Sequence, residues 1–395
     1  MDLFEGWEEH ATERQIEILD AWKEYGSASQ AAKALGLDKS TIVKAKTSVL
    51  EKAARHRLTD EDLALKASPG FGFKRKSLYF NTEKGVTGGW LIQEPDKIQQ
   101  EAMAREFIEG LAESIRGMAR PTKPPVLTTQ ADDYLTTYVL GDAHLGLYAW
   151  GEETGDGDYD SDIAKRHIMT AVDYLVSAAP VSREGILIDV GDLMHMDDTT
   201  NRTFKGKNQL DVDTRFARVM RIAAFVMQYC VEAMLKKHEI VRVVNVRGNH
   251  NPHSSTAVNM ALRMMYEREP RVIIHSNTQF FQYHVFGNNL IGMTHGDTAK
   301  PEKLPGIMAE DQDENWGKCK NRYWIRGHIH HNERKEFGSC AVESFNTLTA
   351  RDSWHTEQGY RAKRSMHMLG IHRKHGIMPR VECPLSLVEE ICNAA

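Results

Sequence analysis

The stretch VRVVNVRGNH, residues 241–250, passes from a run of valines into a glycine followed by asparagine and histidine. β-Branched runs bounded in this way are typical of buried strands. Four further runs also end on polar residues: TTYVLGDAHLG (136–146), GILIDVGDLMH (185–195), NLIGMTHGD (289–297) and RYWIRGHIHH (322–331). One such end is readily explained as a turn, whereas five together indicate a shared site.

Long helical patterns separate several of these strands. The clearest is TRFARVMRIAAFVMQYCVEAMLKKH, residues 214–238. Strands that alternate with helices predict an α/β fold, and such sheets place ligands at the carboxyl ends of their strands. We therefore expect an α/β catalytic domain over residues 131–395, with the Asp, Asn and His residues gathered at one edge.

Composition excludes several classes of protein. The formal net charge of -5 argues against a uniformly basic coat, so any contact with nucleic acid must come from a local patch. The five cysteines are odd in number and lack C-x-x-C spacing, which is typical of reduced thiols. The first residues lack a signal-peptide pattern, and no apolar run reaches the length of a membrane span. We expect a cytoplasmic protein without membrane contact.

Residues 1–58 predict a small helical domain. TERQIEILDAWKEYG (12–26) has apolar residues at helical spacing, with Thr12 as the N-cap and Gly26 as the stop. A short Ala-rich helix, a turn at Gly36 and a longer helix after Asp38 follow, and they resemble a helix-turn-helix of phage packaging and regulatory proteins. A solvated amphipathic hairpin is the alternative. The residues expected to face DNA are Lys39, Ser40, Thr41, Lys44 and Lys46.

Residues 59–130 predict a connector with structure of its own. SLYFNTEKGVTGGWLIQE (77–94) alternates and turns at residues 83–85, which indicates a β-hairpin. An amphipathic helix follows, and the segment RPTKPP (120–125) predicts a stiff linker. The apolar face of the helix is either core or a surface that leaves room for a homodimer. It comprises Ala104, Phe107, Ile108, Leu111, Ile115 and Met118.

The polar strand ends offer ligands for metal ions. Asp142 and His144 lie two residues apart, so an extended segment directs both side chains the same way. Oxygen and imidazole ligands without thiolate suit Mn, Fe, Zn, Mg or Ni, and we place Mn first. Two ions separated by roughly 3.5–4 Å could share one carboxylate and hold a phosphoryl oxygen between them. The remaining candidate ligands are Asp192, Asn249, His295, His328 and His330.

Five short motifs carry a family resemblance. In chain order they are Asp142-x-His144, Gly191-Asp192, Gly248-Asn249-His250, His295-Gly296 and Gly327-His328-x-His330. Each alone is a weak signal, but the ordered set, over roughly residues 134–332, resembles the signature of the calcineurin-like metallophosphoesterases. The resemblance implies a four-layer α/β/β/α sandwich that hydrolyses phosphoesters at a dinuclear metal centre.

The resemblance also implies a role for each matched residue. The first metal is expected on Asp142, His144, Asp192 and His330. The second is expected on Asp192, Asn249, His295 and His328, with Asp192 bridging. His250 would stabilise the transition state and protonate the leaving oxygen, while a hydroxide between the two metals attacks.

Residue 251 departs from the family pattern, which usually has an acid directly after the histidine. An acid there would orient His250 and favour its charged form. Asn251 supplies no charge, although an asparagine can still orient a histidine by hydrogen bonding.

Two further motifs bear on the substrate. DAHLG (142–146) and GDLMH (191–195) resemble the double-strand-break repair nucleases of the superfamily, in which a second histidine lies beside the catalytic one. His195 occupies that position, and simple packing of the loop is an equally good explanation. NRTFKGKNQ (201–209) adds cations near the site, of which Arg202 and Lys205 are candidate phosphate contacts. Nucleases of that branch have an ATPase partner, and no obligatory partner of this kind is evident from the sequence.

Three functions remain open. The leading hypothesis is a DNA phosphodiesterase with its own DNA-binding module. The second keeps the metals but acts on nucleotides, cyclic nucleotides or phosphomonoesters. The third is a DNA-binding protein with an inactive metal domain, and the complete ligand set argues against it.

Overall fold

The computed structural model describes residues 8–56, 71–81, 85–98, 116–117, 119, 121–127, 129–203, 206–276 and 278–394. The chain forms two compact units, residues 1–111 and 112–395. The boundaries predicted at residues 58 and 130 stay predictions.

The first unit begins with helices. After a short turn of 3₁₀ helix, η1 (Glu8–His10), come α1 (Glu13–Tyr25), α2 (Ala28–Leu35) and α3 (Lys39–His56). The predicted signals at the ends of α1 are confirmed. Thr12 forms a capping box with Gln15, and Gly26 ends the helix with a left-handed backbone. Ile18, Ala31 and Ile42 lie in the core between the three helices.

A two-stranded antiparallel hairpin completes the described part of this unit. Strands β1 (Phe71–Asn81) and β2 (Gly85–Pro95) pair in the register Ser77↔Trp90 and Asn81↔Gly85. The predicted hairpin is therefore confirmed, although turn residues 83 and 84 lie outside the described residues. The predicted amphipathic face at 104–118 lies outside them as well, so the homodimer that it suggested stays a prediction.

The second unit contains a six-stranded sheet in the order β13-β12-β3-β4-β5-β6. Strands β3 to β6 run parallel, and β12 and β13 extend the sheet in antiparallel fashion from β3. The strands are β3 (Tyr134–Leu140), β4 (Glu184–Asp189), β5 (Ile240–Asn245), β6 (Val272–Ile274), β12 (Ser365–His372) and β13 (Gly376–Pro384).

A five-stranded sheet has the order β10-β11-β9-β8-β7. Strand β9 is parallel to both of its neighbours, and the outer pairs are antiparallel. The strands are β7 (Gln282–Phe286), β8 (Asn289–Met293), β9 (Asn321–Arg326), β10 (Glu333–Phe337) and β11 (Cys340–Ser344).

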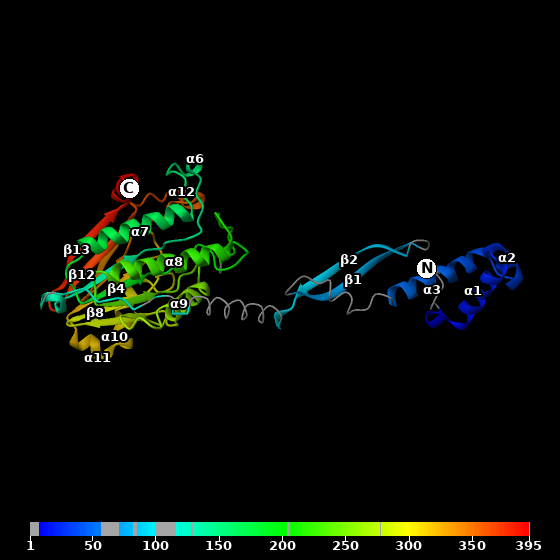
Figure 1. The fold of residues 1–395 in the computed structure, drawn as a ribbon, viewed down its shortest axis with the longest axis horizontal. Coiled ribbons are helices and arrows are strands. Elements are labelled where there is room, and N and C mark those ends of the chain that lie inside the picture. The colour runs from blue at the N-terminus through cyan, green and yellow to red at the C-terminus, as the bar shows by residue number, and fades with distance from the viewer. Residues whose placement is uncertain are drawn as a thin grey trace. The chain divides into compact units, whose positions relative to one another are not determined.

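Three cores divide this unit into four layers. One core, which includes Val139, Ile188 and Ile325, lies between the two sheets. A second packs helices α7 (Ser161–Ala178), α8 (Phe216–Leu235), α9 (Ser254–Met265) and α13 (Leu385–Ala394) on the outer face of the six-stranded sheet. A third packs α10 (Leu304–Asp311) against the five-stranded sheet, near α11 (Asp313–Lys318) (Figure 1). The layers therefore follow the predicted order α/β/β/α.

The remaining elements are short. They are η2 (Thr129–Asp132), α6 (Gly151–Thr154), η3 (Pro301–Lys303) and α12 (Ser353–Glu357). The predicted stiff linker RPTKPP is described from residue 121 on, where it forms neither helix nor strand. Thr122 donates from its backbone to Glu269 at 2.8 Å, and Arg271 donates to the carbonyl of Lys123, so this segment is tied to the sheet domain. No described helix has the length and apolar character that crossing a membrane requires.

Candidate metal centre

The predicted ligands follow five strands, as their sequence positions indicated. Asp142, Asp192 and Asn249 come after β3, β4 and β5, which lie side by side and parallel. His144 also follows β3, whereas His295 follows β8 and His328 and His330 follow β9, two parallel neighbours in the other sheet. Because the two sheets share a core, both sets of strand ends reach one place. Six of the seven predicted ligands form two groups of three that could each hold a metal ion.

The first group comprises Asp142, His144 and His330. Nε2 of His144 lies 3.1 Å from Nε2 of His330, and His330 Nε2 lies 3.8 Å from Asp142 Oδ1. The backbone N–H of His328 donates to both oxygens of the Asp142 carboxylate, at 2.9 and 3.0 Å, and so fixes its orientation. Hydroxyls of Thr347 and Thr349 donate to the Asp142 carbonyl at 2.7 and 2.9 Å.

The second group comprises Asp192, His295 and His328. His295 donates from Nδ1 to the carbonyl of Val190 at 2.9 Å, so Nε2 is the nitrogen that faces the other ligands. That nitrogen lies 2.9 Å from Asn249 Oδ1 and 3.1 Å from Asp192 Oδ2. The predicted fourth ligand, Asn249, is therefore in place as well.

Backbone geometry around the centre is unusual. Asp142, His144, Asp192, His328 and His330 all have a positive φ, between 21° and 72°. Such conformations cost free energy for residues with a side chain, and they cluster at functional sites. The chain accepts this strain at the ligands, which indicates that their directions matter more than local stability.

Electrostatics leave most of the imidazoles neutral. Burial, with the nearby His250 and His330, holds the pKa of His144 well below its usual range. Burial and the neighbouring His355 lower the pKa of His330 to about 3, and burial and His295 lower that of His328 to about 4. Neutral imidazole is the form that binds a metal.

The carboxylates and His295 form a tightly coupled set. Burial raises the pKa of Asp142 to about 7. Burial also acts to raise the pKa of Asp192, but His295 and His250 outweigh it and leave this pKa below its usual range. Burial acts to lower the pKa of His295, yet Asp192 raises it to about 10.

These donors fit divalent metal ions. His144 Nε2 and His330 Nε2 face each other at 3.1 Å, and with the N–H of each ring on the other nitrogen, a cation between them would satisfy both lone pairs. Buried carboxylates such as Asp142 and Asp192 require compensating positive charge. Oxygen and nitrogen donors without sulfur suit the metals predicted from the sequence.

His250 lies beside the centre and is held by the backbone. Its N–H donates to Asp192 Oδ1 at 2.8 Å, and its Nδ1 donates to the carbonyl of His195 at 2.9 Å. Asn251 does not orient His250 by a hydrogen bond. Asn251 is fully buried, and neither polar atom of its side chain finds a hydrogen-bond partner among the described residues.

His195 is a neighbour of both His144 and His250. Its Nδ1 lies 3.1 Å from Nδ1 of His144, and its ring stacks on His250 with centroids 5.3 Å apart. Burial, with His250 nearby, lowers the pKa of His195 to about 3. The ring thus supports a predicted ligand and the predicted acid.

A cavity of about 520 Å³ opens over the ligands. Asp192, Asn249, His250, His328 and His330 line it together with Asp297. Arg202 is exposed and is not among the lining residues, so its contact with phosphate stays a prediction. Lys205 lies outside the described residues.

The segment after β11 also contributes to this cavity, and sequence reasoning missed it. Asp352, Trp354, His355 and Tyr360 all line the cavity. His355 donates from its backbone and its Nδ1 to Asp352 Oδ1, at 2.8 and 2.6 Å. The density of aromatic residues in DSWHTEQGY (352–360) was the signal that could have found them.

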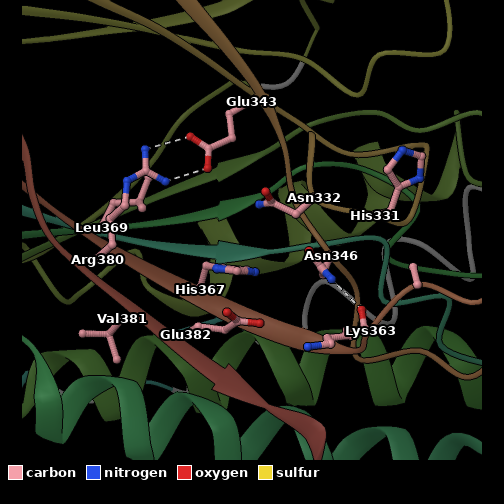
Figure 2. A pocket seen from close by; sticks show the side chains of 11 residues that line it. His331, Asn332, Glu343, Asn346, Lys363, His367, Leu369, Arg380, Val381 and Glu382 are labelled. Atoms are coloured by element: carbon pink, nitrogen blue, oxygen red, sulfur yellow. Dashed lines mark hydrogen bonds and ion pairs between the residues drawn. The ribbon is translucent and has the colours of Figure 1, made fainter. Parts of the chain in front are cut away.

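A second cavity, of about 580 Å³, lies next to the first and shares His331 with it. Arg380 donates to both oxygens of Glu343 at 2.6 and 2.8 Å, and the amide of Asn346 donates to the carbonyl of Lys363 (Figure 2). Within the described part of the chain, no group of three metal ligands lies here. The first cavity is therefore the candidate active site.

The residues expected to face DNA lie on α3. Lys39, Ser40, Thr41 and Lys44 are exposed. Lys46 differs from these four, because it is half-buried and its ammonium lies over the ring of Trp22, 4.4 Å from the centroid.

Comparison with known proteins gives distant likenesses. No family model and no curated protein matches the chain. Similar solved structures include YfcE, a phosphoesterase from E. coli, with 15% identity and a TM-score of 0.33 over 62% of this chain and 98% of that chain. Wild-type Vps29 complexed with Zn²⁺ from Entamoeba histolytica has 13% identity and a TM-score of 0.27 over 63% and 99%. Phosphopantetheinyl hydrolase from Mycobacterium tuberculosis has 10% identity and a TM-score of 0.25, over 58% of this chain and 94% of that chain. Likenesses this weak establish no family, and the function must come from the site itself.

Proposed function

We propose that the chain is a phosphoesterase that works with two divalent metal ions and cleaves phosphodiester bonds in DNA. The proposal rests on the position of Asp192 Oδ2, which lies 3.1 Å from His295 Nε2 and 4.0 Å from His144 Nε2. One carboxylate oxygen thus lies between the two ligand groups, as a pair of ions that share a ligand requires. Bound ions would supply Lewis-acid stabilisation of the phosphoryl oxygens and lower the pKa of a water molecule. Manganese is our first choice.

His250 would serve the leaving group. Its Nδ1–H is held by the carbonyl of His195, so Nε2 is the nitrogen left to face a substrate. In the doubly protonated ring, the proton on Nε2 would pass to the leaving oxygen while Nδ1 keeps its bond to the carbonyl. The hydrogen bond from the His250 backbone to Asp192 ties the position of this acid to the ligand shared by both groups.

DNA is the proposed substrate because of the helical first unit. Lys39 and Lys44 are exposed on α3 with Ser40 and Thr41, and such side chains suit contacts to phosphates. The net charge of -5 requires a local basic surface of this kind if the protein is to hold DNA.

A nucleotide is the second candidate substrate. The cavity over the ligands, at about 520 Å³, is in the range of small-molecule sites. A single nucleotide or cyclic nucleotide would then be cleaved, and the helical unit would serve targeting or self-association.

The test compares hydrolysis of linear DNA and of a chromogenic phosphodiester in the presence of Mn²⁺. We expect His250→Ala to lower turnover of both roughly 10²- to 10⁴-fold while the protein keeps its metals. Asp192→Ala should lose metal as well as activity. His253→Ala is the matched control, because His253 is a neighbouring but exposed histidine that does not line the cavity.

The outcomes separate the candidates. Hydrolysis of the small diester without hydrolysis of DNA would favour the nucleotide substrate. A metal-loaded protein that hydrolyses neither compound would refute the phosphoesterase.

A further inference from the structure

A row of aromatic rings leads outward from the metal ligands. The ring of His355 stacks on the ligand His330, with centroids 5.0 Å apart and planes at 19°. Trp354 and Tyr360 each meet His355 edge-on, at 4.9 and 5.4 Å, and stack on each other at 5.9 Å. All four rings line the same cavity.

The two outer rings are exposed. Trp354 is 55% exposed and Tyr360 is 40% exposed, although rings of this size contribute most to stability when they are buried. An exposed pair at the mouth of a cavity is unexplained by packing. Exposed aromatic surface in the lining of a cavity is suited to contact with a ligand.

The rings are held in place by the surrounding chain. Asp352 caps α12, and Ser353 donates from its hydroxyl to Glu153 at 2.7 Å. Gly359, with a φ of 80°, turns the chain so that the backbone of Tyr360 donates to the carbonyl of His355 at 3.0 Å. A platform that is ordered in advance loses little entropy when a ligand stacks on it.

We propose that Trp354 and Tyr360 form a stacking platform for an unpaired nucleobase of the substrate. The inference rests on the proposed function, because it names the substrate class of the same cavity. Stacking on aromatic side chains holds bases of any sequence, since every base has a flat face. In a duplex both faces of a base are covered by its neighbours, so the base must come from a single strand or leave the stack.

The edge of the base also meets suitable groups. Asn208 and Gln209 line the cavity and are exposed. Their amides can donate to or accept from the edge of an unpaired base, which is the way in which single-stranded nucleic acids are commonly held.

Calorimetry on the full chain tests the platform without requiring turnover. Deoxyadenosine 5′-monophosphate is compared with deoxyribose 5-phosphate, which carries the same phosphate and sugar without the base. We expect the wild type to bind the nucleotide roughly 5- to 150-fold more tightly. Trp354→Leu should remove this selectivity, and Trp354→Phe, which keeps a ring, should restore most of it. Phe225→Leu is the control, because Phe225 is 47% exposed but lies on α8.

Equal affinity for the two compounds, or unchanged selectivity in Trp354→Leu, would overturn the platform. If the wild type still hydrolysed DNA in that case, the proposed function would be supported and the platform alone rejected. Conversely, selectivity for the nucleotide that depends on Trp354, in a protein that hydrolyses no phosphodiester, would support the platform and reject the proposed function.

Discussion

Gly248 lies directly before the ligand Asn249 and leaves no room for a side chain. A Cβ at this position would lie 1.9 Å from Asp192 Oδ1. We expect Gly248→Ala to displace the shared carboxylate and to weaken metal binding roughly 10- to 100-fold, as loss of a ligand's support does. Gly306→Ala is the control, because no atom lies within 4 Å of the Cβ that it would add in α10. Metal titration of both variants decides: equal affinities would show that the centre tolerates the methyl group.

His238 predicts a pH dependence of stability away from the metal centre. It is fully buried, with Nδ1 on the carbonyl of Ser182 at 3.0 Å and Nε2 on the hydroxyl of Tyr138 at 2.8 Å. Burial lowers the pKa of His238 to about 4, against an ordinary value of 6.5. As the pH falls, His238 is therefore protonated at a higher pH in the unfolded chain than in the folded protein. Stability is complete above about pH 6.5 and is lost as the pH falls toward 4, by up to about 3 kcal/mol.

Denaturant unfolding between pH 4 and 7.5 measures this effect. His238→Gln has no titrating group at this position, so its free energy of unfolding should vary less steeply with pH, whatever its absolute stability. A variant with the slope of the wild type would place the acid sensitivity elsewhere in the chain.

Single residues show where prediction from sequence ends. The metal ligands were predictable because the five motifs themselves contain the Asp, Asn and His residues that can bind a metal. The orientation of His250 was not, because the group that holds it is the backbone carbonyl of His195, and any residue there would supply one. Lys46 likewise has the charge of a DNA contact, but its place over Trp22 depends on how α1 and α3 pack.

At the scale of elements, strands were predicted better than loops. The five polar strand ends were found because β3, β4, β5, β8 and β9 have short apolar runs that stop at glycine. The segment 352–360 has no such periodicity, and its density of aromatic residues does not tell where its rings lie relative to the cavity. Tertiary contacts alone bring it there, through the cap at Asp352 and the turn at Gly359.

Helix α3 predicts a salt-dependent contact with DNA. Lys39→Glu and Lys44→Glu together remove two exposed cations, and we expect the slope of log affinity against log salt to fall in magnitude by about 2. Turnover of a small chromogenic diester should not change, because α3 belongs to the first unit. Lys52→Glu is a control with the same change of charge, placed further along the helix. If its effect per charge equals that of the pair, the first turns of α3 have no special role.

At the scale of the sheet domain, the metal centre connects the two sheets in addition to the hydrophobic core between them. Its ligands come from both sheets, and they lie at the edge of the core between the sheets. Ions that bind only the folded chain stabilise it by about 2.7 kcal/mol per site when free metal is 100 times the dissociation constant. Removal of the metals should therefore loosen the contact between the two sheets as well as abolish activity.

Thermal unfolding with and without a chelator measures this contribution. We expect EDTA to lower the Tm of the Mn²⁺-loaded protein by roughly 5–10 °C for each site that is emptied. His328→Ala should keep the first ligand group and show a smaller effect, whereas Asp192→Asn, which alters both groups, should respond least. A Tm in the wild type that is indifferent to EDTA, despite measured metal content, would mean that the ions bind the folded and unfolded chains alike. The ligands would then contribute to chemistry without holding the two sheets together.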